Sequence, residues 1–523
     1  MRKTNMSISR RKFLGGCAAC AGAAGLIGAP SWLKATSSMG RQGIAKILNE
    51  KLKIRILYAL HAPKQDRPDW PNIGFDFVPV MDAANAELLR NFPGWTFIPT
   101  LATGPEQARK ILEEDKAAPV DGYIVYQMNC WNEVAQTMAT SGKPVLYADF
   151  QYAGSGGFLV YSAAFLHANV RNVGFVASSY FTDMLEAVCC FADARAAGPG
   201  FDFEAAVARI RRTRTPGLGN LACKTDALEL LSPAETVLRM KASKILAVRD
   251  DKGGSASILM GIPVIQVPFA EVNEAWAAAD KDEARTVAGR WAKNAARVEG
   301  VSREELVNSA AMYLGQKAVL KKYGANAITI NCLGGFYGGH IHAFPCLAFH
   351  ELLNEGLVGA CECDVPSTAA MVAFGAMTQG RPGYISDPVI DTSERHIIYT
   401  HCVASNRVFG PGGQTNPYEI LTHSEDRQGA SMRSILPVGY MTTTVEVSED
   451  RHEILVHRAK AVDNDPDDRA CRTKLVAEPI GDIEKLFTMW DTWGWHRVTF
   501  YGDLKDQVYA LADELDWKVV EEA

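Results

Sequence analysis

The sequence predicts an α/β protein with two doubly wound parallel-sheet domains followed by a β-rich C-terminal domain. Short apolar runs of strand length alternate with helical segments from about residue 53 to residue 377, which is typical of βαβ units. From about residue 380 the helical signals thin out, and alternating runs typical of β-strands replace them. The length of 523 residues exceeds what one hydrophobic core sustains, so roughly three domains are expected.

Composition and charge exclude several classes of protein. The chain is 47% hydrophobic and 22% charged, which is far too apolar for a disordered protein. Its formal net charge is −6 and it has no long basic stripe, so nucleic acid is not an expected partner. After residue 30 there is no run of about 18 apolar residues, so no membrane span is expected in the body of the chain.

Residues 1–35 have the features of an export signal. The paired Arg10 and Arg11 precede a moderately apolar, Gly- and Ala-rich run, and no acidic residue occurs here. This pattern resembles a twin-arginine signal, which implies export to the periplasm or the extracellular space. Two alternatives stay open: an amphipathic N-terminal helix, and lipidation at Cys17. Removal of this segment deletes six basic residues, so the net charge changes from 54 − 60 = −6 to 48 − 60 = −12.

The first α/β domain is predicted over residues 36–165. A proline opens its first clear helix, at a position where the missing N–H costs no hydrogen bond. Strands are expected at 54–60, 122–126 and 144–148, and helices at 105–114 and 133–140. The glycine-rich segment 153–158 lacks the lysine of a P-loop and the spacing of a dinucleotide-binding loop. We therefore interpret it as a connection between domains.

The second α/β domain is predicted over residues 166–377, and the β-rich domain over residues 378–523. Strands of the second domain are expected at 173–176, 244–248, 264–267 and 327–331, with helices at 182–192, 272–299, 303–322 and 367–377. In the third domain, β-type runs at 397–400, 440–447 and 453–456 precede a helix at 504–515. The acidic segment 463–468 lacks the glycine and terminal glutamate of a calcium loop, so a solvated turn is expected there.

A small set of acidic and imidazole side chains stands at the ends of predicted strands. Glu362 lies between two cysteines after an apolar run, where a buried carboxylate is costly unless it is paired or binds a metal. Asp387, His401 and His496 occupy similar positions further along the chain. Two carboxylates with one or two imidazoles suit Mn²⁺ or Mg²⁺ better than zinc. Spacing alone does not bring these residues together, and a core ion pair is the alternative for Glu362.

Four motifs between residues 356 and 503 carry a resemblance to a known family. They are Gly359-Ala360-Cys361-Glu362-Cys363-Asp364-Val365, the aspartate after Gly380-Arg381-Pro382, the pair His401-Cys402, and Gly494-Trp495-His496 with Gly502-Asp503. With them the chain resembles the L-fucose isomerase and L-arabinose isomerase superfamily, in particular its fucose isomerase-like branch. The resemblance implies two Rossmann-like domains followed by a β-barrel-like domain. It also implies a divalent cation, usually Mn²⁺ with Mg²⁺ or Co²⁺ as alternatives, and a homo-oligomer, either a trimer or a hexamer.

The resemblance also implies roles for individual residues. Glu362 and Asp387 match the two acidic ligands and catalytic carboxylates, and His496 matches the C-terminal histidine ligand. His401 falls where the arabinose isomerase branch has a further metal histidine; the alternative is a hydrogen-bonded histidine that supports its strand. Asp391 competes with Asp387 for the second acidic position.

Three weaker candidates for substrate binding are His423, Arg472 and Trp495. The alternatives are a surface loop for His423 and a core ion pair for Arg472. His340 and His342 are better interpreted as structural residues.

The implied function is a divalent-metal-dependent isomerase that interconverts an aldose and a ketose through a cis-enediol. A monosaccharide is the expected partner. Two alternatives stay open: an exported carbohydrate-binding protein, because two doubly wound domains with a cleft also suit that role, and a different metal-dependent reaction on a sugar at the same site.

Overall fold

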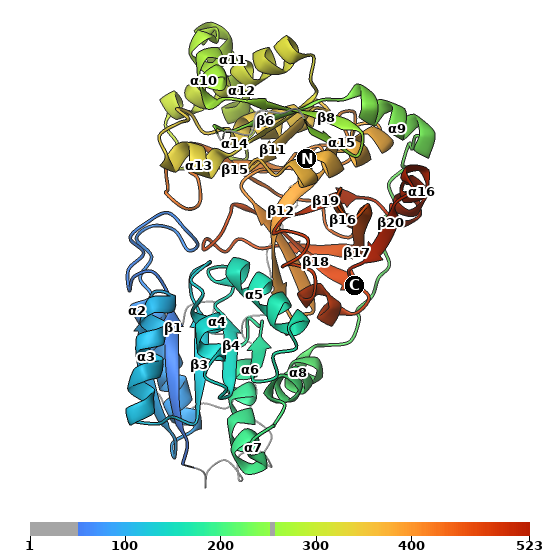
Figure 1. The fold of residues 1–523 in the computed structure, drawn as a ribbon. Coiled ribbons are helices and arrows are strands. Elements are labelled where there is room, and N and C mark those ends of the chain that lie inside the picture. Colours follow the sequence, from blue (N-terminus) through green and yellow to red (C-terminus); the bar gives the residue numbers. More distant parts are fainter. Residues whose placement is uncertain (1–50, 251–256) are drawn as a thin grey trace, which may run out of the picture.

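The computed structural model describes residues 51–250 and 257–523, so the predicted export signal lies outside the described part of the chain. The protein consists of two α/β units and a β-barrel, and Figure 1 shows the α/β units at opposite ends with the barrel between them and to one side. In the described residues no helix is both long and apolar enough to cross a membrane.

The first unit has a five-stranded, fully parallel sheet in the order β2-β1-β3-β4-β5. Its strands are β1 (Lys53–Ala59), β2 (Thr96–Ala102), β3 (Gly122–Gln127), β4 (Val145–Asp149) and β5 (Val173–Val176). The helices of this unit are α2 (Val78–Asn91), α3 (Pro105–Ala117), α4 (Val134–Ala139), α5 (Ser155–His167), α6 (Phe181–Val188), α7 (Cys190–Ala197) and α8 (Phe203–Arg214).

Both faces of this sheet are buried. On β1, Ile54 and Ile56 join one apolar cluster, whereas Leu57 and Ala59 join another on the opposite face. Successive side chains of a strand point to opposite faces, so helices must cover both sides of the sheet. This is the doubly wound arrangement that the sequence predicts.

The second unit has the strand order β11-β10-β6-β8-β7, which is parallel except for the edge strand β7. Its strands are β6 (Ile245–Val248), β7 (Ser257–Leu259), β8 (Ile262–Val267), β10 (Ala327–Ile330) and β11 (Val358–Cys361). Its helices are α9 (Pro233–Ala242), α10 (Phe269–Ala278), α11 (Lys281–Asn294), α12 (Arg303–Tyr323), α13 (Cys332–Tyr337), α14 (Cys346–Asn354) and α15 (Val365–Met377).

The third unit is a closed barrel of six antiparallel strands. The order β16-β19-β12-β13-β18-β17 closes because β17 also pairs with β16, and β20 adds in parallel to β17. The elements are β12 (Tyr384–Asp391), β13 (His396–His401), β16 (Met441–Ser448), β17 (Glu453–Asn464), β18 (Thr473–Ile480), the 3₁₀-helix η1 (Ile483–Phe487), β19 (Arg497–Tyr501), α16 (Lys505–Leu515) and β20 (Lys518–Glu521). A small sheet of β9 (Arg297–Val298), β14 (Tyr418–Leu421) and β15 (Ser431–Ser434) lies beside it.

The structure corrects the predicted boundary after residue 165. The strand at 173–176, which the sequence assigns to the second domain, pairs with β4 and completes the first sheet. The glycine-rich segment before it is the start of α5 rather than a connection between domains. A Cβ atom on Gly154 would lie 2.1 Å from the carbonyl oxygen of Gln127, and one on Gly156 would lie 2.9 Å from Sγ of Cys130. The glycines therefore allow a close approach of helix and strand.

Candidate functional site

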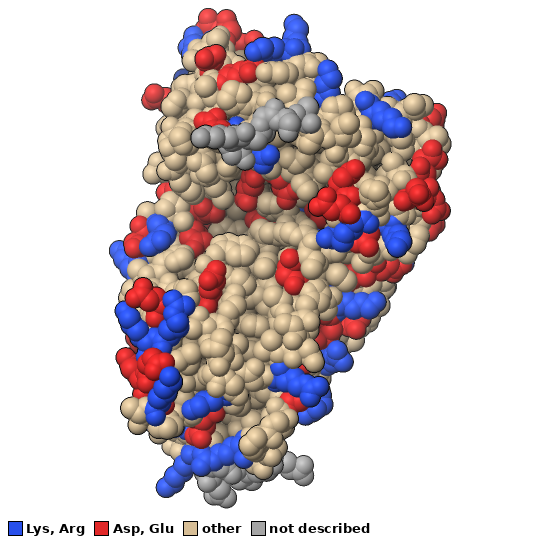
Figure 2. All heavy atoms as spheres, in the orientation of Figure 1, with Lys and Arg blue, Asp and Glu red and all other residues tan. Residues whose placement is uncertain are grey.

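A cavity of about 770 Å³ opens where the three units meet. The segments after β1 and β3 of the first sheet and after β6, β10 and β11 of the second sheet supply part of its wall, together with strands β7 and β8. The barrel and the loop between β14 and β15 supply further lining residues. The lining includes Asp69, Trp70, Cys130, Trp131, Arg249, Leu333, Glu362, Asp387, Glu425, Trp495 and His496. Figure 2 shows acidic side chains gathered in the hollow between the two ends of the molecule. Ligands of doubly wound proteins bind at the carboxyl ends of the parallel strands, as this cavity would allow.

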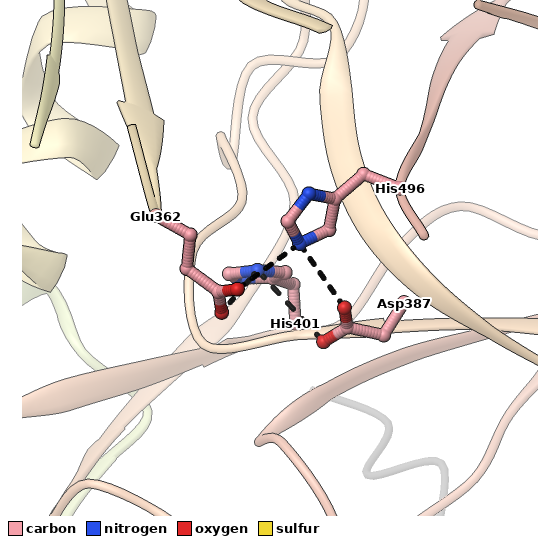
Figure 3. A group of neighbouring side chains, drawn as sticks. All are labelled: Glu362, Asp387, His401 and His496. Carbon is pink, nitrogen blue, oxygen red and sulfur yellow. Dashed lines mark ion pairs between the residues drawn. The ribbon is translucent and has the colours of Figure 1, made fainter. Parts of the chain in front are cut away.

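Four side chains from distant parts of the sequence meet at this cavity: Glu362, Asp387, His401 and His496. Each offers one ligand atom, and these four atoms all lie within 4.8 Å of one another. Nε2 of His496 lies 3.1 Å from Asp387 Oδ1 and 3.4 Å from Glu362 Oε2. Nε2 of His401 lies 3.6 Å from Glu362 Oε1. Figure 3 shows the carboxylates and imidazoles pointing toward a common centre.

Glu362 projects from a sharp turn between β11 and α15. Glu362 and Cys363 both have left-handed backbones, with φ of 62° and 53°. Such conformations are unfavourable for residues other than glycine and persist only where the surrounding structure enforces them. Here the Cys363 N–H donates to the carbonyl of Ile330 at 3.0 Å, and Asp364 caps α15 by accepting from Ser367 N at 2.9 Å. The turn thus holds Glu362 at the strand end, and its side chain remains 28% exposed.

Neighbouring barrel strands carry Asp387 and His401. Asp387 lies opposite Thr400 in the antiparallel pair of β12 and β13, so His401 is next to it on the adjoining strand. Both side chains are buried. Asp391, the competing acid, lies four residues further along β12 and accepts from the amide of Ser179 at 3.1 Å. The structure therefore brings Asp387 into the cluster and leaves Asp391 outside it.

His496 directly precedes β19, and its neighbour Arg497 holds the backbone there. Arg497 Nη1 donates to the carbonyls of His496 at 2.8 Å and Gly494 at 3.1 Å. Its guanidinium is fully buried, pairs with Glu522 at 2.8 Å and lies over the ring of Trp490. A rigid, buried ion pair thus supports the loop that presents His496.

The second ring nitrogen of each histidine is engaged by the protein. Nδ1 of His496 lies 2.9 Å from Oδ2 of Asp364, so it carries a proton toward that carboxylate and leaves Nε2 directed at the cluster. Nδ1 of His401 instead accepts the amide hydrogen of Cys402 at 3.0 Å. In a neutral His401 ring, the proton therefore sits on Nε2, the atom that faces Glu362 and Asp387.

Electrostatic interactions in the cluster oppose the effects of burial. Burial alone would lower the pKa of His496, but Glu362, Asp364 and Asp387 outweigh it and raise that pKa well above its ordinary value. Burial would raise the pKa of Glu362, yet His496 and His401 hold it below its ordinary value. For Asp387 burial prevails and raises the pKa. The carboxylates therefore favour positive charge at the centre of the cluster, which a metal ion would supply.

The residues present fit a divalent ion. Asp387 Oδ1, His401 Nε2 and His496 Nε2 are buried atoms with no hydrogen-bond partner. Buried polar atoms without partners are rare and need an explanation, and a bound cation is one that suits carboxylate oxygen and imidazole nitrogen together. The donor set of two carboxylates with imidazole is one that could bind a divalent metal ion.

The three weaker candidates have different positions. Trp495 lines the cavity, and its ring packs edge-on against Trp131 with centroids 6.0 Å apart. His423 is buried beside Asp426, with Nδ1 and Oδ1 3.3 Å apart. Arg472 is also buried and donates to the carbonyl of Thr422 at 2.8 Å. Neither His423 nor Arg472 is among the described residues that line the cavity.

Sequence reasoning missed several cavity residues. Arg249 follows β6 and Trp131 follows the strand end of β3, so the rule that ligands bind at the carboxyl ends of parallel strands would have pointed to both. Asp364 lies within the quoted motif around Glu362, but nothing in the sequence indicates its contact with His496. Glu425 lies in the loop between β14 and β15 and carries no sequence signal.

Comparison with known proteins gives a partial match to sugar isomerases. No family model matches the chain. The chain is 27% identical over 213 residues to the sulfoquinovose isomerase of Clostridium sp. (strain MSTE9). The aligned segment covers 39% of this chain and 46% of that protein. The chain is 26% identical over 143 residues to the sulfoquinovose isomerase of Priestia megaterium (strain ATCC 12872 / QMB1551). This aligned segment covers 26% of this chain and 31% of that protein. The chain thus spans less than half the length of these curated relatives.

Solved structures give only a weak likeness. An ABC transporter solute binding protein from Bacillus halodurans C-125 with bound myo-inositol is 14% identical, and the match covers 55% of this chain and 80% of that one with a TM-score of 0.17. A carbohydrate transporter from Acidothermus cellulolyticus 11B in complex with myo-inositol is 11% identical, with coverages of 56% and 80% and a TM-score of 0.17. Likeness at this level carries no argument about fold or function.

Proposed function

We propose that the chain is a divalent-metal-dependent isomerase that interconverts an aldose and a ketose. The observation that carries the proposal is the convergence of Glu362, Asp387, His401 and His496 on one point of a large cavity. The curated relatives named as sulfoquinovose isomerases support it, because they share the reaction class that the sequence motifs imply.

In this proposal Glu362, Asp387 and His496 hold the ion. His496 can present the Nε2 lone pair because its proton stays on Nδ1, which donates to Asp364. His401 would contribute an N–H donor instead, because its Nδ1 already accepts the amide of Cys402. When bound, the ion supplies Lewis acidity that polarises a sugar carbonyl and makes the neighbouring C–H more acidic.

The two carboxylates are the proton carriers of the reaction. One of Glu362 and Asp387 removes the proton from the carbon next to the carbonyl, and the other moves the hydroxyl proton, which gives a cis-enediol. Return of the proton to the neighbouring carbon completes the conversion. A carboxylate beside a cation is a weak base, so placement of the proton within reach matters more than basicity.

The aromatic wall of the cavity would orient the sugar. Trp70, Trp131 and Trp495 all line the cavity. The ring of Trp131 is exposed, and its backbone is left-handed with φ of 58°. This conformation is unfavourable for tryptophan, so the surrounding fold must hold it in place. Tryptophan rings offer a broad apolar face with little conformational freedom, which suits the C–H face of a sugar ring.

Arg249 is a cationic side chain of the cavity that suits an anionic substituent. Among the described lining residues Arg249 is the only Lys or Arg. Sulfoquinovose, the sugar in the relatives' names, carries a sulfonate group, and a guanidinium binds such oxygens through paired hydrogen bonds. Sulfoquinovose therefore belongs in the substrate panel beside L-fucose and L-arabinose.

Metal analysis combined with activity tests the proposal. The purified protein is expected to hold about one Mn²⁺ or similar ion per chain, and a chelator is expected to remove both the ion and the aldose–ketose conversion of the active sugar. A protein that binds sugar without converting it, with or without metal, would point to a carbohydrate-binding role instead.

Export by the twin-arginine route is a second part of the proposal. It rests on Arg10 and Arg11 and on the absence of acidic residues before residue 36. Replacement of both arginines by lysine is expected to retain the protein in the cytoplasm. Normal export of that variant would contradict this route.

A further inference from the structure

Glu425 is a carboxyl group of the cavity that the metal cluster does not use. It lines the same cavity as Glu362, Asp387 and His496 but lies outside the four-residue group. Its backbone carbonyl accepts the N–H of Ile73 at 2.8 Å, so its loop is fixed to the first α/β unit.

Outside the metal cluster, the other carboxyl groups among the described lining residues are those of Asp69 and Asp364, and both are engaged within the protein. Asp69 Oδ2 lies 2.7 Å from His61 Nε2, and its Oδ1 accepts from the amide of Trp70 at 2.7 Å. Asp364 uses Oδ2 for His496 and Oδ1 for the amide of Ser367. Both oxygens of each group are therefore engaged within the protein.

Glu425 differs because only one of its oxygens is engaged. The hydroxyl of Tyr337, the last residue of α13, donates to Oε2 at 2.7 Å. No hydrogen bond to Oε1 occurs among the described residues, which leaves this oxygen for a molecule in the cavity that Glu425 lines. Because Tyr337 donates to Oε2, a proton on the carboxyl belongs on Oε1.

The surroundings of Glu425 keep that proton in place. Burial raises the pKa of Glu425 to about 8, and the negative charges of Asp69 and Glu362 add to the effect. His423 and Tyr337 act in the opposite direction without cancelling it. At neutral pH the group is mostly a neutral acid, which can donate a proton.

We propose that Glu425, positioned by Tyr337, donates the proton that opens the ring of a cyclic sugar in this cavity. This inference rests on the proposed isomerase function, because aldoses are mainly cyclic and an isomerase needs the open chain. The proton of Glu425 passes to the ring oxygen as the bond between that oxygen and C1 breaks. The proton of the C1 hydroxyl passes to Asp387, which lines the same cavity, and the C1 carbonyl forms.

Ring opening has a readout separate from isomerisation. Opening and reclosure interconvert the α- and β-anomers, and NMR saturation transfer measures that interconversion directly. The experiment compares wild type, Glu425→Gln and Tyr337→Phe with whichever of L-fucose, L-arabinose and sulfoquinovose the wild type converts. Glu419→Gln is the matched control, because Glu419 lies on β14, pairs with Arg297 at 3.0 Å and does not line the cavity.

Wild type and Glu419→Gln are expected to accelerate anomer interconversion. Glu425→Gln is expected to lose this acceleration by about 100-fold, within the range for a lost general acid. Tyr337→Phe is expected to lose less, because the carboxyl remains. Glu425→Gln should still bind Mn²⁺ as the wild type does and should still exchange the C2 hydrogen of glyceraldehyde, which cannot form a ring.

Two results would overturn the inference. One is an anomer interconversion by Glu425→Gln at the wild-type rate. The other is an equal loss of anomer interconversion, Mn²⁺ binding and glyceraldehyde exchange, which would give Glu425 a structural role. Failure of the proposed function is distinguishable, because the wild type itself would then neither hold a metal nor convert any of the three sugars.

Discussion

Nδ1 of His496 and Oδ2 of Asp364 are 2.9 Å apart. This contact fixes the ring so that Nε2 faces Glu362 and Asp387. Two further hydrogen bonds extend from Asp364 into the core. Asp364 accepts from the amide of Ser367, and the Ser367 hydroxyl donates to Glu446 at 2.7 Å. The candidate metal centre is therefore supported by a buried hydrogen-bonded chain.

Asp364→Asn tests the importance of that support. Asparagine keeps the helix cap but removes the charge that holds the Nδ1 proton of His496. Loss of such a partner is expected to weaken Mn²⁺ binding by about 10- to 100-fold, as measured by isothermal titration calorimetry. Asp391→Asn, on the same barrel strand as Asp387 but outside the cluster, is the control. Unchanged Mn²⁺ affinity in Asp364→Asn would contradict the role of the contact.

The number of imidazoles on the ion distinguishes the roles of the two histidines. Because His401 Nδ1 accepts the amide of Cys402, we expect only His496 to bind through nitrogen. Electron spin-echo envelope modulation of bound Mn²⁺ should report one histidine nitrogen, and His496→Asn should remove it. His401→Asn should retain the signal and the Mn²⁺ stoichiometry. Two coordinated imidazoles would instead support the ligand role that the family resemblance implies for His401.

Arg249 is expected to discriminate between charged and neutral sugars. Arg249→Gln should lower kcat/KM for sulfoquinovose by at least tenfold, because loss of a hydrogen bond to a charged group costs about 1.5–3 kcal/mol. Conversion of L-fucose or L-arabinose should change less than twofold. Parallel losses for charged and neutral sugars would show that Arg249 does not recognise an anionic substituent.

Glu446 makes stability depend on pH. Burial is the main cause that raises its folded-state pKa to about 8 from an ordinary value of 4.5. Between about pH 4.5 and about pH 8 the folded protein therefore holds a proton that the unfolded chain has released. The contribution of Glu446 to the free energy of unfolding is complete below about pH 4.5 and is lost as pH rises through about 8. In Glu446→Gln, urea unfolding should show a smaller decline in the free energy of unfolding over this window. Equal slopes for variant and wild type would refute the assignment.

The order of strands and helices was largely predictable because local patterns determine it. Continuous apolar runs such as β3 and β4 are typical of strands buried on both faces. The structure confirms a β-barrel and two α/β sheets, which are parallel apart from the edge strand β7. The end of the first sheet was not predictable. Strand β5 follows the glycine-rich start of α5 in the chain and pairs with β4. Those glycines allow close packing and do not form a linker between domains.

The candidate cluster was predictable only through the resemblance. Glu362 and His496 are 134 positions apart, and no periodicity joins them; the sharp turn after β11 and the loop before β19 bring them together. The roles of Asp364 and Glu425 depend on the three-dimensional contacts with His496 and Tyr337. Such contacts leave no pattern in a single sequence.

Glu362→Gln, assayed by solvent exchange at C2 of the active sugar, tests the central claim most directly. The variant keeps the size of the side chain and removes its charge. We expect a folded protein, with a circular dichroism spectrum and a melting temperature close to those of the wild type, in which C2 exchange and aldose–ketose conversion fall by at least 1,000-fold, roughly the scale of a lost general base. Full exchange in a folded Glu362→Gln protein would contradict the assignment of this cluster as the catalytic centre.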